Sequence, residues 1–148
     1  GYSSSNHNEH SEFNLPGTLY NGDVTPDLIG TDLAVICIGN PSVKQQIYKE
    51  FSRAGFSFPT IVHPSCEVSP LATLEDGVVI SPQSIVSPNA MIGKLTYLNF
   101  SCGIGHDALV GDFVQINPGS QLGGFTKIGN QVLIGSGSGS AISLSWYM

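Results

Sequence analysis

Aliphatic residues recur at every sixth position through the second half of the chain, without a gap from Val62 to Ile134. A second row of small or β-branched residues follows four positions after each of them, from Cys66 to Ser138. A period of six fits neither an α-helix nor an amphipathic strand, whose periods are about 3.6 and 2. It is typical of a hexapeptide β-helix, in which short strands wind into a solenoid. The aliphatic row is Val62, Val68, Leu74, Ile80, Val86, Ile92, Leu98, Ile104, Val110, Ile116, Leu122, Ile128 and Ile134.

Glycine and proline recur in the same repeat. Glycines that directly follow the aliphatic residue are expected at bends, because they have no Cβ, and prolines one position further on are expected to keep the turns rigid. The repeat is expected to stop at Ser140, where an aliphatic residue is due, and the apolar tail 141–148 departs from the register. Either this tail caps the solenoid or the sequence is cut short there, and we favour the second interpretation.

The segment before the repeat predicts a strand followed by a helix. The run from Leu33 to Ile38 is apolar throughout, as in a strand buried on both faces. Asn40 is a suitable N-cap, Pro41 suits the first helical position, and Gly55 can end the helix. We interpret residues 1–60 as a partial Rossmann-like domain that lacks its N-terminal half, because no glycine-rich loop precedes residue 33, and residues 61–148 as a β-helix domain.

Composition narrows the choice of partners and of compartment. The 148 residues carry a formal charge of −6 and five basic residues, which argues against nucleic acid or an anionic membrane as a partner. No apolar run approaches the roughly 20 residues that span a bilayer, and the N-terminus does not look like a signal peptide, so we expect a cytoplasmic protein. Cys66 and Cys102 should lie two coils apart, at about 10 Å, which is too far for a disulfide.

Several motifs carry a resemblance to a known family. Over residues 33–139 the chain resembles the hexapeptide-repeat sialic acid O-acetyltransferases and UDP-4-amino-sugar N-acetyltransferases. The strand and helix that lead into an Ile-Val-His-Pro-Ser junction, combined with a His-acid pair in a later coil, are the more specific part. The matching motifs are Ile61 to Cys66, Gly105-His106-Asp107, Gly111-Asp112-Phe113, Asn117-Pro118-Gly119 and Leu122-Gly123-Gly124.

This resemblance implies a fold, an activity and a set of site residues. It implies a homotrimer of left-handed parallel β-helices, each preceded by a Rossmann-like sugar-nucleotide domain, with acetyl-coenzyme A bound between neighbouring helices. The implied reaction transfers acetyl to an amino or hydroxyl group of a nucleotide-activated amino sugar or a sialic acid, without a metal. His106 matches the general base, Asp107 its acidic neighbour, and Gly124 the residue whose N–H meets the thioester carbonyl.

The residues themselves support this arrangement. His106 follows Ile104 by two positions, in a row that also holds prolines, so it should point outward. Gly124 should lie one coil above it, about 5 Å along the axis, if a coil holds three hexads. A histidine can take the proton of an attacking amine or alcohol, and a glycine N–H can meet the oxyanion. Asp107 needs a corner between itself and His106 to reach the imidazole, and a solvated turn residue is the alternative.

Other residues are candidates for the donor site or for the trimer contact. Gln115 stands where the family often has a second histidine near the acetyl donor, and it can hydrogen-bond but not titrate. Lys127 is a candidate contact for a coenzyme A phosphate. Tyr97, Phe100 and Phe113 are expected on the outside, where exposed aromatic residues suit a trimer contact.

Other functions remain possible on the same solenoid. The broken repeat and the missing strands also fit a non-catalytic or degenerate trimeric scaffold. A metal-dependent enzyme would need several histidine ligands on adjacent coils, and the repeat contains only His63 and His106.

Overall fold

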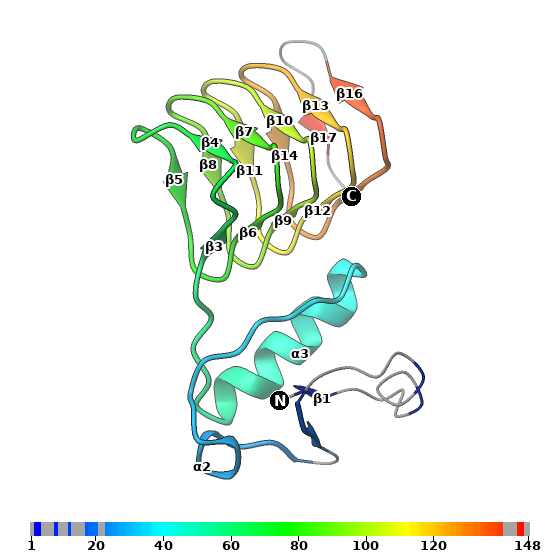
Figure 1. The fold of residues 1–148 in the computed structure, drawn as a ribbon. Helices are drawn as coiled ribbons and strands as arrows, with labels where there is room; N and C mark the ends of the chain where they lie inside the picture. Colours follow the sequence, from blue (N-terminus) through cyan, green and yellow to red (C-terminus); the bar gives the residue numbers. More distant parts are fainter. Residues whose placement is uncertain are drawn as a thin grey trace.

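The computed structural model describes residues 2–3, 8, 12, 17–20, 23–140 and 145–146. From residue 61 onward the chain winds into a parallel β-solenoid, seen along its side in Figure 1. Its two-residue strands form three parallel sheets of five strands each. Sheet I consists of β3 (Ile61–Val62), β6 (Val79–Ile80), β9 (Tyr97–Leu98), β12 (Gln115–Ile116) and β15 (Leu133–Ile134). Sheet II consists of β4 (Glu67–Val68), β7 (Ile85–Val86), β10 (Gly103–Ile104), β13 (Gln121–Leu122) and β16 (Gly139–Ser140). Sheet III consists of β5 (Thr73–Leu74), β8 (Met91–Ile92), β11 (Leu109–Val110), β14 (Lys127–Ile128) and β17 (Ser145–Trp146).

The register confirms that three hexads make one coil. Ile104 pairs with Val86 below it and with Leu122 above it, so strand partners are 104 − 86 = 18 residues apart. The aliphatic row points inward and is almost fully buried from Ile80 to Ile128, and the small-residue row is buried between its members. The sequence-based prediction of a parallel β-solenoid is therefore confirmed, and its left hand stays a prediction from the family resemblance.

The corners of the solenoid are made by left-handed backbone conformations. From Gly77 to Gly137, the third residue after each aliphatic position has a positive φ. The expectation that glycines just after the aliphatic residue make the bend is therefore wrong. At Gly105, for example, a Cβ would lie 2.4 Å from the backbone nitrogen of Gly124 on the next coil. The glycine is needed because the coils approach closely there.

The described residues before the solenoid form short elements and the helix α3 (Pro41–Arg53). β1 (Tyr2–Ser3) pairs in parallel with β2 (Leu19–Tyr20), and α2 (Pro26–Ile29) follows. α3 begins as predicted, because the Asn40 side chain accepts hydrogen bonds from the Ser42 and Val43 nitrogens. α3 lies under the edge formed by β6, β9 and β12 (Figure 1), where Tyr48 packs on Phe113 at 5.5 Å between ring centroids.

The expected buried strand at residues 33–38 is not formed. One parallel bridge joins Leu33 to Ser57, and within the described parts of the chain residues 34–38 belong to no strand. Leu33 and Val35 are 55% and 47% exposed, and Cys37 is exposed as well. An apolar run can be buried on both faces only when strands or helices cover both of them, and here one face remains open. The Rossmann-like character of this unit is limited to the helix and this single bridge.

The solenoid register continues past the position where the sequence pattern ends. Ser140 pairs with Leu122, and Trp146 pairs with Ile128. The predicted stop at Ser140 is therefore wrong, because the strand ladder uses backbone groups, which every residue provides. Ser140 Oγ also accepts a hydrogen bond from the Gly123 nitrogen and lies 2.9 Å from Thr126 Oγ1. Residues 141–144 and 147–148 of the proposed tail lie outside the described residues.

Two further features concern the cysteines and the helices. Cys37, Cys66 and Cys102 are free thiols, and burial raises the pKa of Cys102. Among the described residues, no helix combines the length and apolar character needed to cross a membrane.

Candidate functional site

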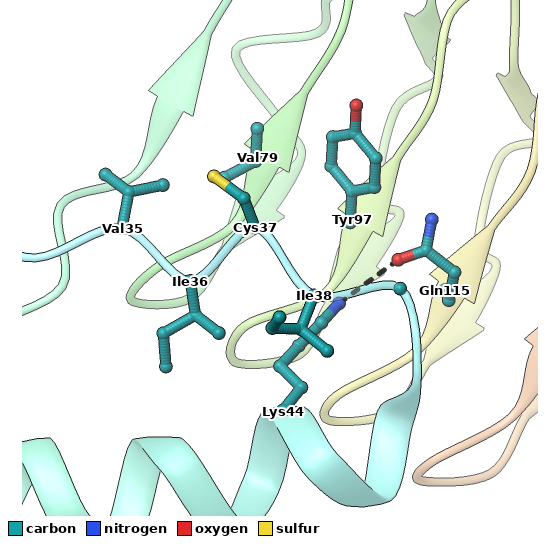
Figure 2. Close-up of a pocket in the computed structure, with 9 residues that line it drawn as sticks. Val35, Ile36, Cys37, Ile38, Lys44, Val79, Tyr97 and Gln115 are labelled. Carbon is teal, nitrogen blue, oxygen red and sulfur yellow. Dashed lines mark hydrogen bonds between the residues drawn. The ribbon is translucent and has the colours of Figure 1, made fainter. Parts of the chain in front are cut away.

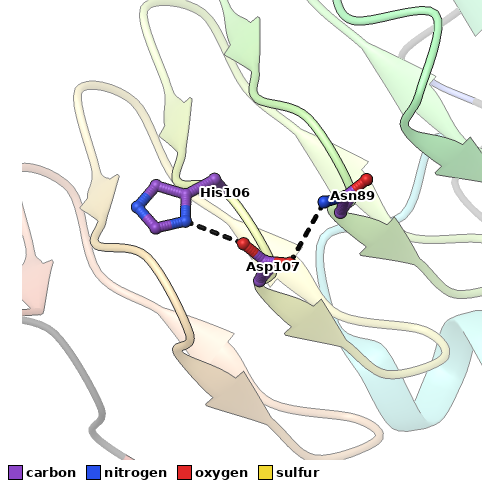
Figure 3. Close-up of polar contacts among 3 residues, drawn as sticks. All are labelled: Asn89, His106 and Asp107. Carbon is purple, nitrogen blue, oxygen red and sulfur yellow. Dashed lines mark hydrogen bonds and ion pairs between the residues drawn. The ribbon is translucent and has the colours of Figure 1, made fainter.

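His106 and Asp107 lie together at the corner between β10 and β11, where sheets II and III meet. The imidazole Nδ1 is 2.8 Å from Asp107 Oδ2 (Figure 3). Successive residues of a strand could not meet in this way, but Asp107 has a φ of +58°, so the chain turns between the two side chains. This is the corner that the predicted contact required. The side chains are 56% and 37% exposed, so the pair is open to a ligand.

The charge on Asp107 determines which imidazole nitrogen carries the proton. The hydrogen bond from His106 lowers the pKa of Asp107 most, and the hydrogen bond from Asn89 lowers it further. The Asp107 side chain is therefore a carboxylate at neutral pH. A carboxylate only accepts hydrogen bonds, so His106 Nδ1 must be the donor. Nε2 of the neutral ring is then left with its lone pair, as a general base requires.

Asn89 completes this group and was not identified from the sequence. Its Nδ2 donates to Asp107 Oδ1 at 3.2 Å from the corner one coil below (Figure 3). The signal was present in the sequence, because Asn89 precedes Asp107 by eighteen residues, the length of one coil. The group therefore spans two coils: Asn89 below, with Asp107 and His106 above it.

Gly124 lies directly above His106, as its place in the repeat predicts. A Cβ added to Gly124 would lie 2.7 Å from His106 Nε2 and 2.8 Å from Cε1. The imidazole therefore sits against the backbone of the next coil, in space that only a glycine leaves free. The ring of Phe125 meets the imidazole edge-on, with 5.1 Å between the ring centroids. These contacts hold the histidine from above.

The backbone N–H of Gly124 belongs to a row that the coil-to-coil ladder does not use. Pro64, Pro70, Pro82, Pro88 and Pro118 occupy the same position of other hexads. Proline has no N–H, so the ladder must form without one at this position. Where the N–H is present, it can bind a side-chain oxygen of the next coil: Lys94 N donates to Asp112 Oδ1 at 3.0 Å, and Asp112 N to Asn130 Oδ1 at 2.8 Å. The Gly124 N–H has the same position and suits an added acceptor.

Gln115 lies away from this corner. It is in β12 on sheet I, which faces the N-terminal unit, and it is 4% exposed. Its Oε1 accepts a hydrogen bond from Lys44 Nζ at 3.3 Å (Figure 2), and its Nε2 donates to Asn117 Oδ1 at 3.3 Å. One chain therefore does not bring Gln115 and His106 together.

Lys44 is a second residue that sequence analysis did not single out. Its side chain, 1% exposed, lies beside a cavity of about 180 Å³ between residues 35–39 and sheet I. Its ammonium lies 6.0 Å from the centre of the Tyr97 ring. Burial lowers the pKa of Lys44 to about 8. Lys44 therefore links α3 to the solenoid through Gln115.

The remaining candidates, a lysine and three aromatic residues, differ in how far they are exposed. Lys127 is the first residue of β14 on sheet III and its side chain is exposed, on the coil that contains Gly124. Phe100 is 52% exposed, as expected. Phe113 is 7% exposed, which corrects its predicted outward position, because α3 covers it. Tyr97 is half-buried beside Lys44. Among the described residues, no three His, Cys, Asp or Glu side chains lie close enough together to hold a metal ion.

The fold and the His-Asp corner define a hexapeptide-type parallel β-solenoid with an exposed His-Asp pair at one corner. No protein-family model matches the sequence. Among solved structures, the chain is similar to the acetyltransferase domain of PglB from Neisseria gonorrhoeae, with 31% identity and a TM-score of 0.73, over 75% of this chain and 54% of that one. The resemblance to the hexapeptide-repeat sugar acetyltransferases is thereby confirmed.

Two further solved structures share the fold at lower identity. A variant of perosamine N-acetyltransferase from Caulobacter crescentus, in complex with CoA and GDP-perosamine, matches with 22% identity and a TM-score of 0.72, over 81% of this chain and 66% of that one. WeeI from Acinetobacter baumannii matches with 15% identity and a TM-score of 0.65, over 97% and 91%. The chain thus spans about half of the PglB domain and about two thirds of the perosamine enzyme.

Proposed function

We propose that this chain is the catalytic part of an acetyl-coenzyme A-dependent acetyltransferase. Its acceptor is an amino or hydroxyl group of a nucleotide-activated amino sugar or a sialic acid. The observation that carries the proposal is the pair of His106 Nδ1 and Asp107 Oδ2 at 2.8 Å, open to solvent and directly below Gly124. The likeness to the PglB acetyltransferase domain supports the reaction class, and the CoA and GDP-perosamine bound to the perosamine enzyme support a sugar-nucleotide acceptor.

The proposed chemistry assigns one task to each residue of the corner. The donor supplies an acetyl group activated as a thioester. His106 Nε2 takes the proton from the attacking amine or hydroxyl group, and the Asp107 carboxylate stabilises the resulting imidazolium. The Gly124 N–H faces the negative charge that develops on the carbonyl oxygen, and the missing Cβ leaves room for the His106 imidazole beside it. No task in this scheme requires a metal.

The residues around the corner fit an acetyl-coenzyme A site in part. The exposed Lys127 provides a positive charge for a phosphate, on the coil that contains Gly124. Gln115 is 4% exposed and bonded to Lys44 on sheet I, away from the corner of sheets II and III, so the proposed donor site does not include it. We also propose that the protein is a homotrimer. The exposed Ile85, Met91, Leu109 and Phe100 supply apolar surface for it.

The remaining parts of the proposal concern the N-terminal unit and the compartment. We assign residues 1–60 to the sugar-nucleotide side of the protein and residues 61–148 to acyl transfer. A cytoplasmic location is proposed as well, and the three free cysteines agree with it.

The first experiment compares two exposed histidines of the solenoid, His106 at the corner of sheets II and III and His63 on the first coil. We expect His106→Ala to lower kcat for acetyl transfer by about 10²- to 10⁴-fold, because the general base is lost. His63→Ala is the matched control, since His63 is exposed on the first coil and bonds Ser65 Oγ at 2.9 Å. It should keep the wild-type rate. Rates are measured with acetyl-coenzyme A and a panel of UDP-amino sugars, GDP-amino sugars and sialic acid, and oligomeric state by light scattering.

Two outcomes would contradict the proposal. Undiminished transfer by His106→Ala would remove His106 as the base. If calorimetry detects no binding of acetyl-coenzyme A to the wild-type chain at millimolar concentration, a non-catalytic trimeric scaffold becomes the better interpretation.

A further inference from the structure

The Asp107 carboxylate has both of its oxygens engaged, each by a different side chain. Oδ2 accepts from His106 Nδ1 at 2.8 Å, and Oδ1 accepts from Asn89 Nδ2 at 3.2 Å (Figure 3). The terminal torsion of an aspartate is broad, so one bond alone leaves the carboxylate plane free to turn. Two bonds from opposite sides restrict that plane and the direction in which Oδ2 faces the imidazole.

We infer that Asn89 is a positioning residue for acetyl transfer: by orienting Asp107 from one coil below, it holds His106 in the tautomer whose Nε2 can accept a proton. This inference rests on the proposed function. Asn89 lies on the opposite side of Asp107 from His106, so its effect on the reaction passes through the carboxylate.

The backbone of this corner favours Asn and Asp but does not require Asn89 in particular. Asn89 and Asp107 have φ values of +61° and +58°, and these two residue types tolerate the left-handed region better than most. Other corners of the same solenoid place Gln83, Ser101 and Phe125 in the same conformation. The backbone therefore explains why a residue can turn here, whereas the side chain of Asn89 needs a separate explanation.

A second corner offers a direct comparison. Gln83 and Ser101 are also eighteen residues apart, both have positive φ, and their side chains are joined. There the upper residue donates, from Ser101 Oγ to Gln83 Oε1 at 3.4 Å, and no histidine precedes Ser101. At the His106 corner the lower residue donates. A carboxylate can only accept, so the amide nitrogen of Asn89 matches the need of Asp107.

The exposure of the His106 corner indicates that the bond between Asn89 and Asp107 contributes to orientation more than to stability. His106 and Asp107 are 56% and 37% exposed, and ion pairs that are this open add little to folding stability. Orientation is different, because neutral imidazole can carry its proton on either nitrogen. An Asp107 that turns away lets the proton move to Nε2, and a ring protonated there cannot act as a base toward the acceptor.

The experiment uses two substitutions at Asn89 and a matched control at the second corner. Asn89→Gly removes the side chain and keeps the left-handed backbone, and Asn89→Asp keeps the size but replaces the donor with a second carboxylate. Gln83→Gly makes the same backbone change away from His106. We expect both Asn89 variants to lower kcat by about tenfold at unchanged KM for acetyl-coenzyme A, and Gln83→Gly to match the wild type.

A spectroscopic measurement separates positioning from a general loss of structure. Imidazole ¹⁵N shifts of the full chain, recorded above neutral pH, report which nitrogen carries the proton. The wild type and Gln83→Gly should show His106 mainly protonated at Nδ1, and both Asn89 variants should show a larger Nε2-protonated fraction. Asn89→Gly should also raise the pKa of Asp107 relative to the wild type, since one of the bonds that lower it is lost.

Each result has a distinct meaning. Wild-type kcat and an unchanged tautomer in both Asn89 variants overturn the inference while the proposed function stands. An equal fall of kcat in Gln83→Gly overturns it too, because the effect would then belong to any corner of the solenoid. A wild-type chain that binds no acetyl-coenzyme A and transfers no acetyl group overturns the proposed function itself.

Discussion

Two apolar segments of this chain differ in how deeply they are buried. Between Val78 and Val132 the inward-facing residues of the solenoid are almost fully buried. The run from Leu33 to Ile38 is just as apolar, yet Leu33, Val35 and Ile38 are 55%, 47% and 39% exposed. The solenoid strands are only two residues long, and the exposed run is longer than any of them. Neither apolar content nor length accounts for the difference.

The difference lies in where each segment finds its partner. A residue of the repeat meets its partner eighteen residues later on the same chain, as Ile104 meets Leu122. The sequence that specifies one coil thus also supplies the coil that covers it. Residues 34–38 have no such repeat: a single bridge joins Leu33 to Ser57, and Ala34 and Ile36 pack only partly buried against the cluster around Phe56. An apolar pattern becomes a buried strand only where the chain also provides the covering surface.

The largest effect is expected from shortening a side chain at the centre of the repeat. Ile104→Ala should lower the free energy of unfolding by about 2–5 kcal/mol, because Ile104 is 1% exposed and the rigid coils cannot close the cavity. Val35→Ala is the control from the exposed run and should change it by less than about 0.5 kcal/mol. Urea denaturation followed by circular dichroism measures both. Similar losses in the two variants would contradict the distinction between the segments.

A smaller effect is expected from separating two coils. Gly105→Ala should destabilise the protein by about 1–3 kcal/mol, because its Cβ would lie 2.4 Å from Gly124 N and 2.5 Å from Gly123 C. Gly135→Ala occupies the same position of a later hexad, where the nearest atom, Ser138 Oγ, is 3.5 Å away. Thermal unfolding of the two variants checks the prediction. An unchanged melting temperature in Gly105→Ala would show that the coils can move apart at no cost.

The smallest effect concerns the link between the two regions and depends on pH. Burial lowers the pKa of Lys44 to about 8 in the folded chain, from its ordinary value of 10.5. Between these values the unfolded state binds the proton more fully than the folded state, so the Lys44 contribution makes stability rise with pH. Below pH 8 both states are protonated, and the unfavourable burial of the charge is present in full.

Lys44→Met should therefore be more stable than the wild type at pH 7, by about 1 kcal/mol once the lost bond to Gln115 is included. Its advantage should shrink as pH rises from 8 toward 10.5. The measurement is the difference in free energy of unfolding between the two proteins at several pH values, which cancels the titration of other groups such as Cys102. A difference that is independent of pH would contradict the lowered pKa of Lys44.

The candidate site shows the same division between what a pattern predicts and what contacts decide. Counting hexads placed His106 outside and Gly124 one coil above it, and both expectations are confirmed. The period contained the position of Asn89 as well, but only the structure shows its bond to Asp107. The turn at Asp107 was an open question, because the six-residue period does not by itself say which residue of a hexad takes the positive φ; the structure shows that it is the third after the aliphatic residue.

By itself, the sequence determined the parallel solenoid and its two buried rows, because a repeat specifies its own neighbours. The strand register then established that a coil holds three hexads. Only the tertiary structure decided that Asp107 turns toward His106, that Gln115 is covered by Lys44, that α3 buries Phe113 and that residues 33–38 remain open. Each of these depends on a corner geometry or on contacts between segments that share no period. These contacts join residues that are close in space but not at a fixed spacing along the chain, and a sequence pattern can predict spatial neighbours only where it repeats.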